Sequence, residues 1–396
     1  MTTDIQSEYI SMDLRGVREV LGMLATEFDR MKKAKKAGRP IVGTWLNSPN
    51  EILLAANTYA TTFRFEGLHS DIIKGREDLR KAYEMFNMEQ CFCLDVCRSL
   101  GSPVLGAPRD YDLVVTDFTA KAPEWEGIMK TYIDEKWNFM PLEIPRGLEK
   151  KEALTHIEER LNGLRAALEE MTGKEITDDE LRDAFEKTNR VRDQVKKIDE
   201  LIKTDPMPIR GGDVWFAYFP MSSCYIGGEV DKTHDLLEDL HSQIQERIES
   251  GFAAYDRDVK KICAIPSGSN VTKDVYPVME KAGGVLVTDW PCCEHGGLLF
   301  RDRIKLVGDP IKNLAKHYLK TFGIFDEVQD AKDILEMVNR LSIDAVIYDK
   351  QLDLFGYKAP VASVSEVMKV LSEKGIPIHV HEGHDVSGIK AFIEAC

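Results

Sequence analysis

The sequence predicts an α/β fold made of two Rossmann-like lobes, each built on a parallel sheet, joined by a helical hairpin. In both halves, short apolar runs alternate with stretches of helical periodicity, which favours parallel sheets covered by helices. A charged block without proline lies between the halves, and 396 residues are too many for one ordinary core. We therefore expect three parts: 1–147, an N-terminal helix with the first lobe; 148–205, the hairpin; and 206–396, the second lobe.

The first part begins with residues 8–38, where apolar side chains recur at three- and four-residue steps and predict one long helix. Its basic end, residues 30–39, is expected to cap the exposed end of this helix. Pro49 and Glu51 open a second helix. Buried strands are predicted at 39–46, 111–118 and 139–146. This alternation predicts a parallel sheet with helices on both faces.

Residues 148–204 carry helical periodicity in two blocks. Gly173 ends the first block, since glycine commonly follows the last turn of a helix. The second opens with a capping box, in which the Thr177 oxygen accepts a free N–H and Glu180 reaches back. We expect the two helices to form a clamp or spacer between the lobes, ended by the prolines and glycines of 203–213.

The second lobe follows a helix predicted at 230–250. Its strands are predicted at 260–270 (passing into a loop), 284–290, 344–351 and 376–383, before a closing helix at 386–396. His379 and His381 alternate along the last strand and so face one side, where we expect a solvent-facing or interface position. The order of elements matches the first lobe, so the lobes are candidates for distant copies of one fold.

Composition and charge exclude several classes of partner. The formal net charge of −15 disfavours nucleic acid and anionic membrane surfaces, which require clustered Lys and Arg. No apolar run approaches the roughly 20 residues of a membrane span, and the N-terminus lacks the pattern of a signal peptide. Eight cysteines in 396 residues do not make a secreted disulfide framework. We expect a cytoplasmic protein with some thiols buried and others available to a metal.

Open parallel sheets bind ligands beyond the carboxyl ends of their strands. The fingerprints of dinucleotide sites (G-x-G-x-x-G), P-loops (G-x-x-x-x-G-K-[ST]) and zinc proteases (H-E-x-x-H) are missing, as are the paired C-x-x-C units of zinc ribbons. The position of ligands beyond strand ends therefore predicts where a ligand would bind but not which ligand it is. The candidate loops are 46–50, 116–122, 264–270, 288–297 and 351–357.

Four cysteines are candidate metal ligands. Cys93 and Cys97 share one face if their segment is helical, and Cys292 and Cys293 are adjacent at the end of the strand at 284–290. Thiolates are the ligands that iron–sulfur clusters require. The alternative is that these thiols are buried as small apolar side chains, and both interpretations are open at this point.

Polar residues near two predicted strand ends are candidates for chemistry. Glu294 and His295 form a candidate acid–base pair beside two glycines that allow close backbone approach. Alternatively, His295 only hydrogen-bonds within a turn. In "IPSGSN", Ser267, Gly268 and Ser269 form a candidate cradle for a phosphate or carbonyl group, although Ser-Gly-Ser also makes ordinary turns.

The sequence as a whole resembles the large subunits of the benzoyl-CoA reductase and 2-hydroxyacyl-CoA dehydratase family, in particular the dehydratase D-components. The resemblance runs in order from about residue 10 to the C-terminus. It rests on "NEILLAANTY", "LDVCRSLG", "YDLVVTDFTAKAPEWEGIMK", "MTGKEITDDELRDAFEKTNRVR" and "DAVIYDKQLDLFGYKAP". Two further segments, "CYIGGEV" and "EHGGLLFRD", are similar to the benzoyl-CoA reductase branch.

The resemblance implies an oxygen-sensitive, anaerobic heterodimer of two such two-lobed subunits. A subunit of this family typically holds an iron–sulfur cluster, 4Fe-4S or larger, through three cysteines beside an acyl-CoA substrate. A separate ATP-hydrolysing iron–sulfur activator supplies electrons at very low potential. Reduction of an aromatic ring, or loss of a 2-hydroxyl group through a ketyl radical, follows.

The cysteine positions of the family are only partly kept in this sequence. Cys97 matches the first position, whereas Thr119 stands at the second and Leu354 or Asp353 at the third. A hydroxyl and an alkyl group cannot replace thiolates on an iron–sulfur cluster. The standard three-cysteine cluster is therefore not expected inside this chain.

Two hypotheses follow for the cluster. In the first, Cys292 and Cys293 join Cys97, with or without Cys93, to hold a relocated or subunit-bridging cluster. In the second, this chain has no cluster, completes the walls of the active site and binds a homologous cluster-bearing subunit.

The function expected from the sequence is that of one subunit of an enzyme that transfers low-potential electrons to an acyl-CoA. Ser267 and Ser269 would donate hydrogen bonds to the thioester carbonyl, where negative charge develops on reduction. Gly268 and Thr119 would line the same substrate site, with His295 supplying protons. The alternatives are a non-catalytic scaffold or assembly subunit of such a complex and a stand-alone two-lobed protein that binds a small molecule.

Overall fold

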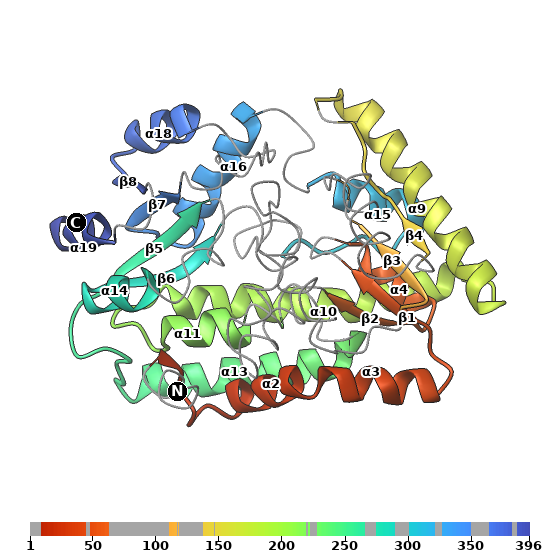
Figure 1. Cartoon of the computed structure of the whole chain (residues 1–396), viewed down its shortest axis with the longest axis horizontal. Helices are drawn as coiled ribbons and strands as arrows, with labels where there is room; N and C mark the ends of the chain where they lie inside the picture. Colours follow the sequence, from red (N-terminus) through yellow and green to blue (C-terminus); the bar gives the residue numbers. More distant parts are fainter. Residues whose placement is uncertain are drawn as a thin grey trace, which may run out of the picture.

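The structure is a computed structural model in which two α/β lobes flank a long helix, α10 (Asp178–Ile202) (Figure 1). The residues that it describes are 9–44, 48–62, 111–116, 118, 138–145, 147–218, 221, 228–265, 275–289, 301–320, 327–349, 364–381 and 386–396.

Each lobe is built on a four-stranded sheet whose neighbouring strands are all parallel. The first sheet has the order β2-β1-β3-β4 and the second β6-β5-β7-β8. This confirms the predicted α/β class with two parallel-sheet lobes. The strands are β1 (Ile41–Thr44), β2 (Tyr59–Thr62), β3 (Leu113–Val115), β4 (Phe139–Met140), β5 (Lys260–Ile265), β6 (Gly284–Asp289), β7 (Ala345–Asp349) and β8 (Ile378–His381).

The two sheets have equivalent strand orders, and in both an aspartate before the third strand makes the same hydrogen bonds to the neighbouring strand. Asp112 precedes β3, and its carboxylate accepts a hydrogen bond from the backbone N–H of Ile41 at 2.8 Å. Asp344 precedes β7 and accepts from the backbone N–H of Lys261 at 2.7 Å. In both lobes the backbone N–H of the aspartate donates back to the carbonyl of the same partner at 2.8 Å. This repeated pairing supports the interpretation of the lobes as copies of one fold.

The N-terminal helix differs from its prediction. It is divided into α2 (Arg15–Ala25) and α3 (Glu27–Lys36), with the break at Thr26. The Thr26 hydroxyl donates to the Gly22 carbonyl at 2.8 Å, a local bond that competes with the helix ladder. The basic residues at the end of α3 lie in its last turn, as expected for cations at the carboxyl end of a helix.

The helices predicted at 148–204 are α9 (Lys150–Thr172) and α10. Gly173 takes the left-handed conformation that ends α9, with φ of 65°. The predicted capping box is confirmed, since the Glu180 N–H donates to Thr177 Oγ1 at 3.2 Å and the Thr177 N–H donates to Glu180 Oε2 at 2.8 Å. Hydrogen bonds from Lys174 and Thr177 lower the pKa of Glu180 to about 2.

These two helices share partners but differ in the main one. α9 packs mainly against α15 (Pro310–Tyr318) and also contacts α4 (Asn50–Ala55), whereas α10 packs mainly against α13 (Val230–Glu249) and also contacts α4 and α15. The side chains of α15 join the first-lobe core although α15 follows β6 in the chain. In the other direction, α2 packs against α13 and its side chains join the second-lobe core. The division into 1–147, 148–205 and 206–396 therefore stays a proposal.

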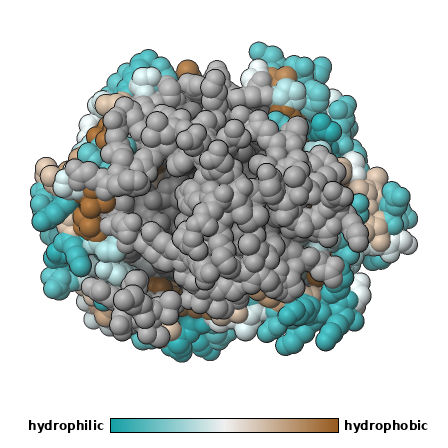
Figure 2. All heavy atoms as spheres, in the orientation of Figure 1, coloured by the Kyte–Doolittle hydropathy of each residue, from teal (hydrophilic) through white to brown (hydrophobic). Residues whose placement is uncertain are grey.

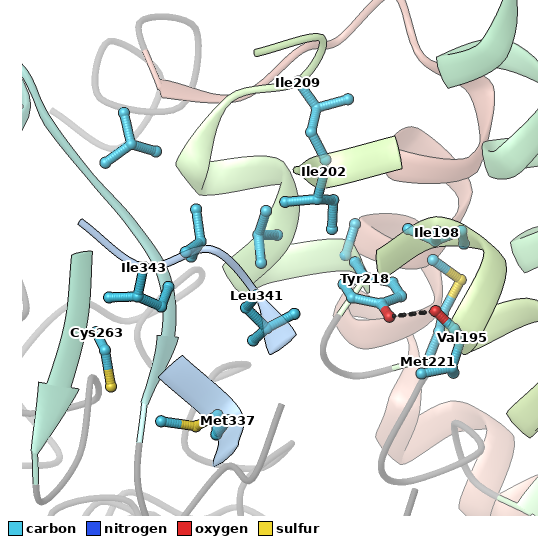
Figure 3. Packing of buried hydrophobic residues seen from close by; sticks show 14 of the residues in the cluster. Val195, Ile198, Ile202, Ile209, Tyr218, Met221, Cys263, Met337, Leu341 and Ile343 are labelled. Carbon is cyan, nitrogen blue, oxygen red and sulfur yellow. Dashed lines mark hydrogen bonds between the residues drawn. The ribbon is translucent and has the colours of Figure 1, made fainter. Parts of the chain in front are cut away.

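The second-lobe core lies between its sheet and the helices α2, α10 and α13 (Figure 3). It includes Val214, Ala217 and Tyr218 of η2 (Val214–Tyr218) and the buried apolar side chains of α16 (Glu327–Arg340). The other face of that sheet packs against α14 (Val275–Lys281) and α19 (Ser387–Ala395), and α18 (Val364–Ser372) packs against α16 and β8. In the view of Figure 2, hydrophilic residues predominate among the coloured residues at the periphery. No helix in the described part of the chain is long and apolar enough to cross a membrane.

Candidate functional site

The strand orders place a topological switch point in each sheet. In the first sheet, the chain passes from β1 to β2 on one side and later to β3 on the other. The second sheet repeats this arrangement with β5, β6 and β7. Ligands of open α/β sheets bind beyond the carboxyl ends of the strands at such points. The ends of β1 and β3, and of β5 and β7, are therefore the two places where a site is expected.

A group of buried polar side chains lies beside the carboxyl ends of β1 and β3. We call it the rim cluster, and it consists of Ser48, Glu51, Arg192, His317 and Tyr318. Glu51 comes from the first turn of α4, Arg192 from α10, and His317 and Tyr318 from the last turn of α15. Three segments far apart in the chain thus meet at one end of the first sheet.

The Ser48 side chain ties the rim cluster to the end of β3. Its hydroxyl lies 3.3 Å from the carbonyl oxygen of Val115 and 3.2 Å from that of Thr116. The Tyr318 hydroxyl lies 3.0 Å from the Ser48 carbonyl oxygen and 2.8 Å from Glu51 Oε2. The ring of Tyr318 also contacts Phe118, with ring centroids 5.4 Å apart. The backbone that follows β1 and β3 is therefore held by the Ser48 hydroxyl and by Tyr318 of α15.

Arg192 provides the positive charge of the rim cluster. It is 2% exposed, and its Nη2 lies 2.5 Å from Glu51 Oε1, whose side chain is fully buried. Its Nη1 donates to Thr188 Oγ1 at 2.7 Å. Nη2 also lies 3.3 Å from His317 Nε2. A guanidinium group only donates, so in this contact His317 accepts at Nε2.

This arrangement suits positioning rather than bond making. Among the described residues, the Glu51 carboxylate and the Arg192 guanidinium compensate each other, and the hydroxyls of Ser48 and Tyr318 hydrogen-bond to the backbone or to Glu51. A buried ion pair of this geometry gives a single defined arrangement of the elements that it joins. The rim cluster therefore fixes the backbone from which the loops after β1 and β3 begin.

A second buried polar group lies further along α10. We call it the junction cluster, and it consists of Asp199, Tyr218, Arg301 and Arg340. Arg301 Nε and Nη2 both donate to the Asp199 carboxylate, Nη2 at 3.0 Å, and the Tyr218 hydroxyl donates to Asp199 Oδ1 at 2.7 Å. Figure 3 shows Tyr218 reaching the backbone of Val195 on α10, where its hydroxyl lies 3.0 Å from the carbonyl oxygen.

Burial and charge control the protonation of the junction cluster. Burial and the Asp199 charge raise the pKa of Tyr218 well above its usual value, so the phenol stays protonated and donates. Burial opposes the charged form of Arg301, but the Asp199 carboxylate outweighs it and raises the pKa. Arg301 is therefore a cation at neutral pH.

The structure does not describe any of the site residues predicted from the sequence. Those residues follow described strand ends in the chain, as Thr119 does after Phe118, but their own positions are not tested. Outside the described residues lie Cys93, Cys97, Thr119, Ser267, Gly268, Ser269, Cys292, Cys293, Glu294 and His295, together with Asp353 and Leu354.

The described cysteines do not fit an iron–sulfur cluster. Cys263 lies in β5, and burial together with the Asp289 charge raises the pKa of its thiol well above its usual value. The thiolate is the form that binds iron, so this thiol is unsuited to the task. Cys396 is the last residue of the chain, near Lys260 and Asp344 at the amino end of the second sheet. A cluster in this chain would need the cysteines outside the described residues.

One group of side chains in the described part of the chain has the spacing of metal ligands. His234, Asp235 and Glu238 on α13 bring ligand atoms within 4.8 Å of one another. They are neighbours on the outer face of one helix, and His234 Nδ1 lies 3.3 Å from Asp235 Oδ1. Surface charges on a helix commonly approach one another in this way, so the group does not define a site.

The residues of the rim and junction clusters were missed in the sequence. The sequence of α10 could have identified some of them. Thr188, Arg192 and Asp199 are spaced by four and seven residues, which places these polar side chains on the buried face of the helix. Polar residues at such positions need partners, which identifies them as buried network residues. Their partners, Glu51 and Arg301, are not identifiable from this periodicity.

His379 and His381 lie on one side of their strand as predicted, with ring centroids 6.3 Å apart. His381 is buried, which contradicts the solvent-facing alternative for it, and the interface alternative is not tested. The ring of His379 stacks on Phe392 of α19, with centroids 5.3 Å apart. The closing helix covers this face of the strand, because its apolar residues pack against the second sheet.

The fold and the switch points define a class of protein: a two-lobed α/β protein with two equivalent parallel sheets and a topological switch point in each. A family model described as 2-hydroxyglutaryl-CoA dehydratase, D-component, matches residues 46–386. The chain belongs to this family, and the resemblance found in the sequence is confirmed. The matched range includes seven of the eight described strands, from β2 to β8. No curated protein matches the chain.

Proposed function

We propose that this chain is a subunit of an acyl-CoA enzyme of the 2-hydroxyacyl-CoA dehydratase type, which uses low-potential electrons. Membership in a dehydratase-component family across both lobes is the observation that carries the proposal. The chain acts with a homologous cluster-bearing subunit and an ATP-hydrolysing iron–sulfur activator, in the cytoplasm of an anaerobic cell. The proposal includes a second reaction type, the reduction of an aromatic acyl-CoA as in benzoyl-CoA reductase.

In this proposal the chain's own residues bind and orient the acyl-CoA. The rim cluster holds the backbone at the ends of β1 and β3, next to Thr119 in the chain. Ser267 and Ser269, with Gly268 between them, follow β5 and donate hydrogen bonds to the thioester carbonyl. His295 supplies a proton, and Glu294 sets the protonation state of His295.

The iron–sulfur cluster belongs to the partner subunit in the version of the proposal that we favour. Thr119 and Leu354 or Asp353 stand where the family has cysteines. The described thiols do not fit a cluster either. The other version places a 4Fe-4S or larger cluster on Cys97, Cys292 and Cys293, with or without Cys93. When bound, the cluster would supply single electrons to the acyl-CoA.

Anaerobic purification of the tagged chain from its own cell tests the proposal. Iron and acid-labile sulfide are measured on the complex and on each separated subunit, with about four irons expected per 4Fe-4S cluster. Iron confined to a partner with the three family cysteines supports the favoured version, and iron on this chain supports the other. A complex without iron after reconstitution contradicts the proposal.

Activity then separates the reaction types. The complex, the activator and ATP are incubated with a 2-hydroxyacyl-CoA or with an aromatic acyl-CoA, and the product is identified by mass spectrometry. A His295→Gln variant should lose turnover while the complex still assembles. Unchanged turnover would remove His295 from the chemistry.

A scaffold or assembly subunit is the second candidate, favoured by the missing family cysteines. Here the complex would assemble, and every substitution at Ser267, Ser269 and His295 would leave turnover unchanged. Isolation of the chain as a monomer that binds a small molecule would instead support a stand-alone binding protein.

A further inference from the structure

Two histidines lie at the carboxyl end of β8, the strand at one edge of the second sheet. His379 and His381 are two residues apart and so project from the same face of the strand. This is the face on which His379 stacks against Phe392 of α19, and Figure 1 shows α19 beside β8. Groups that bind to open parallel sheets lie at such strand ends.

The imidazoles of His379 and His381 have no hydrogen-bond or ion-pair partner in the described part of the chain. Their ring contacts are with each other, at 6.3 Å between centroids, and with Phe392. His381 is 5% exposed. A polar ring that is buried without a partner costs free energy. A ligand that binds the ring nitrogens would remove this cost.

The separation of the two rings fits one shared metal ion. An imidazole nitrogen lies about 2.0–2.1 Å from a metal that it binds, which puts the ring centroid about 3.2 Å from the metal. Two rings on one metal then have centroids about 4.5 Å apart if the two bonds are at right angles, and about 6.4 Å apart if they are opposite. The 6.3 Å between His379 and His381 lies within this range, at its wide end.

The ring of His379 has open space beside one of its nitrogens. Gly388, in the first turn of α19, faces this ring, and a Cβ at 388 would lie 3.2 Å from Cε1 and 3.4 Å from Nε2. Glycine leaves that space empty. Burial and His381 lower the pKa of His379 below its usual value, so the ring is neutral at neutral pH. The neutral imidazole is the form that binds a metal.

We propose that His379 and His381 together bind one divalent transition-metal ion, Zn²⁺, Ni²⁺ or Cu²⁺, at the end of β8. Imidazole nitrogens suit these ions, whereas Mg²⁺ and Ca²⁺ prefer oxygen ligands. The two rings occupy two coordination positions and water fills the others. Glu382, His384 and Asp385 follow in the sequence, but they lie outside the described residues and are not needed as ligands.

This site is independent of the proposed function. Iron–sulfur clusters are held by thiolates, and the site at the end of β8 uses two imidazoles and no cysteine. The net charge of −15 favours the approach of a cation to the chain. Loss of the site would therefore leave the proposed function as it stands, and the reverse also holds.

The full-length chain, purified with a tag that contains no histidine, is titrated with NiCl₂ and ZnCl₂, and with MgCl₂ as the control. Isothermal titration calorimetry counts the binding events. In parallel, NMR follows the Hε1 signals of the nine histidines, assigned through their connections to the backbone. We expect the signals of His379 and His381 to change together at the same Ni²⁺ concentration, and Mg²⁺ to leave both unchanged.

Two variants and a matched control locate the ion. His379→Asn and His381→Asn should each weaken one binding event at least about tenfold, since losing a ligand costs no less than losing a group that orients one. His241→Asn removes a half-buried histidine from α13 and should bind Ni²⁺ as the unchanged chain does. Ni²⁺ should raise the unfolding temperature of the unchanged chain and of His241→Asn more than that of the two variants.

Three results would overturn the proposal. The first is a change of the His379 signal without a change of the His381 signal, which would mean that only one ring binds the ion. The second is Ni²⁺ binding by both variants as tight as that of the unchanged chain. The third is a change of the His234 signal instead, which would place the ion on the outer face of α13. The NMR result on the unchanged chain stands even if a variant fails to fold.

Discussion

The Glu51–Arg192 pair provides the sharpest test of the rim cluster. We predict that Glu51→Gln strongly destabilises the protein although it changes the size of the side chain very little. Glutamine keeps an oxygen that can accept from the Tyr318 hydroxyl. It removes the negative charge 2.5 Å from Arg192 Nη2.

The magnitude follows from the burial of both partners. Arg192 is 2% exposed and Glu51 is fully buried, so water cannot replace the lost carboxylate. Removing one partner of a buried ion pair leaves an uncompensated charge and costs about 3–5 kcal/mol. Thr188 and His317 still accept hydrogen bonds from Arg192, which places the expected value towards about 3 kcal/mol.

Urea unfolding followed by far-ultraviolet circular dichroism measures this loss as a shift of the midpoint. Asp183→Asn, on the same helix as Arg192, is the matched control, because it likewise replaces a carboxylate by an amide, in an exposed pair with Lys187 at 2.7 Å. Exposed helical pairs contribute about 0.3–0.5 kcal/mol. The double variant Glu51→Gln/Arg192→Met should recover most of the lost stability, since it removes the uncompensated charge.

Two outcomes would refute the reasoning. If Glu51→Gln destabilises no more than Asp183→Asn does, the pair is not buried as the structure describes. If the double variant is no more stable than Glu51→Gln alone, the uncompensated Arg192 charge is not the cause of the loss.

Three further predictions concern other parts of the fold. Thr177→Ala removes the capping box and should lower stability by about 1 kcal/mol in the same unfolding assay, and a loss below a few tenths would speak against the cap. In Gly212→Ala the new Cβ would lie 2.9 Å from the backbone carbonyl carbon of Tyr9. We expect a loss of about 1–3 kcal/mol and faster proteolysis near Tyr9, and an unchanged cleavage rate would contradict that contact. Burial and His381 lower the pKa of His379 below its usual value of 6.5, so below that pH the unfolded chain binds more protons there and folding stability falls. His379→Gln should flatten the dependence of stability on pH from about 7 to about 5, and an unchanged slope would rule out this contribution.

Periodicity and residue type in the sequence predicted the elements that carry strong local signals. The capping box at Thr177 and the end of α9 at Gly173 depend on contacts within a few residues, so they are readable along the chain. Strand β2 was not predicted, because Tyr59–Thr62 is only four residues long and too short for a clear alternation of apolar and polar side chains. It exists as a strand through its register with β1, which no local pattern shows.

By itself, the sequence determined the fold class, most of the strands, the capping box and the family. The tertiary structure alone decided which polar side chains meet. Glu51 and Arg192 are 141 residues apart, and Asp199 and Arg301 are 102 apart. The helical period shows that Arg192 faces inward, but the partner of a buried charge depends on how separate elements pack. Packing also placed α15 in the first-lobe core, because its apolar side chains are buried against α9 rather than beside its neighbours in the chain.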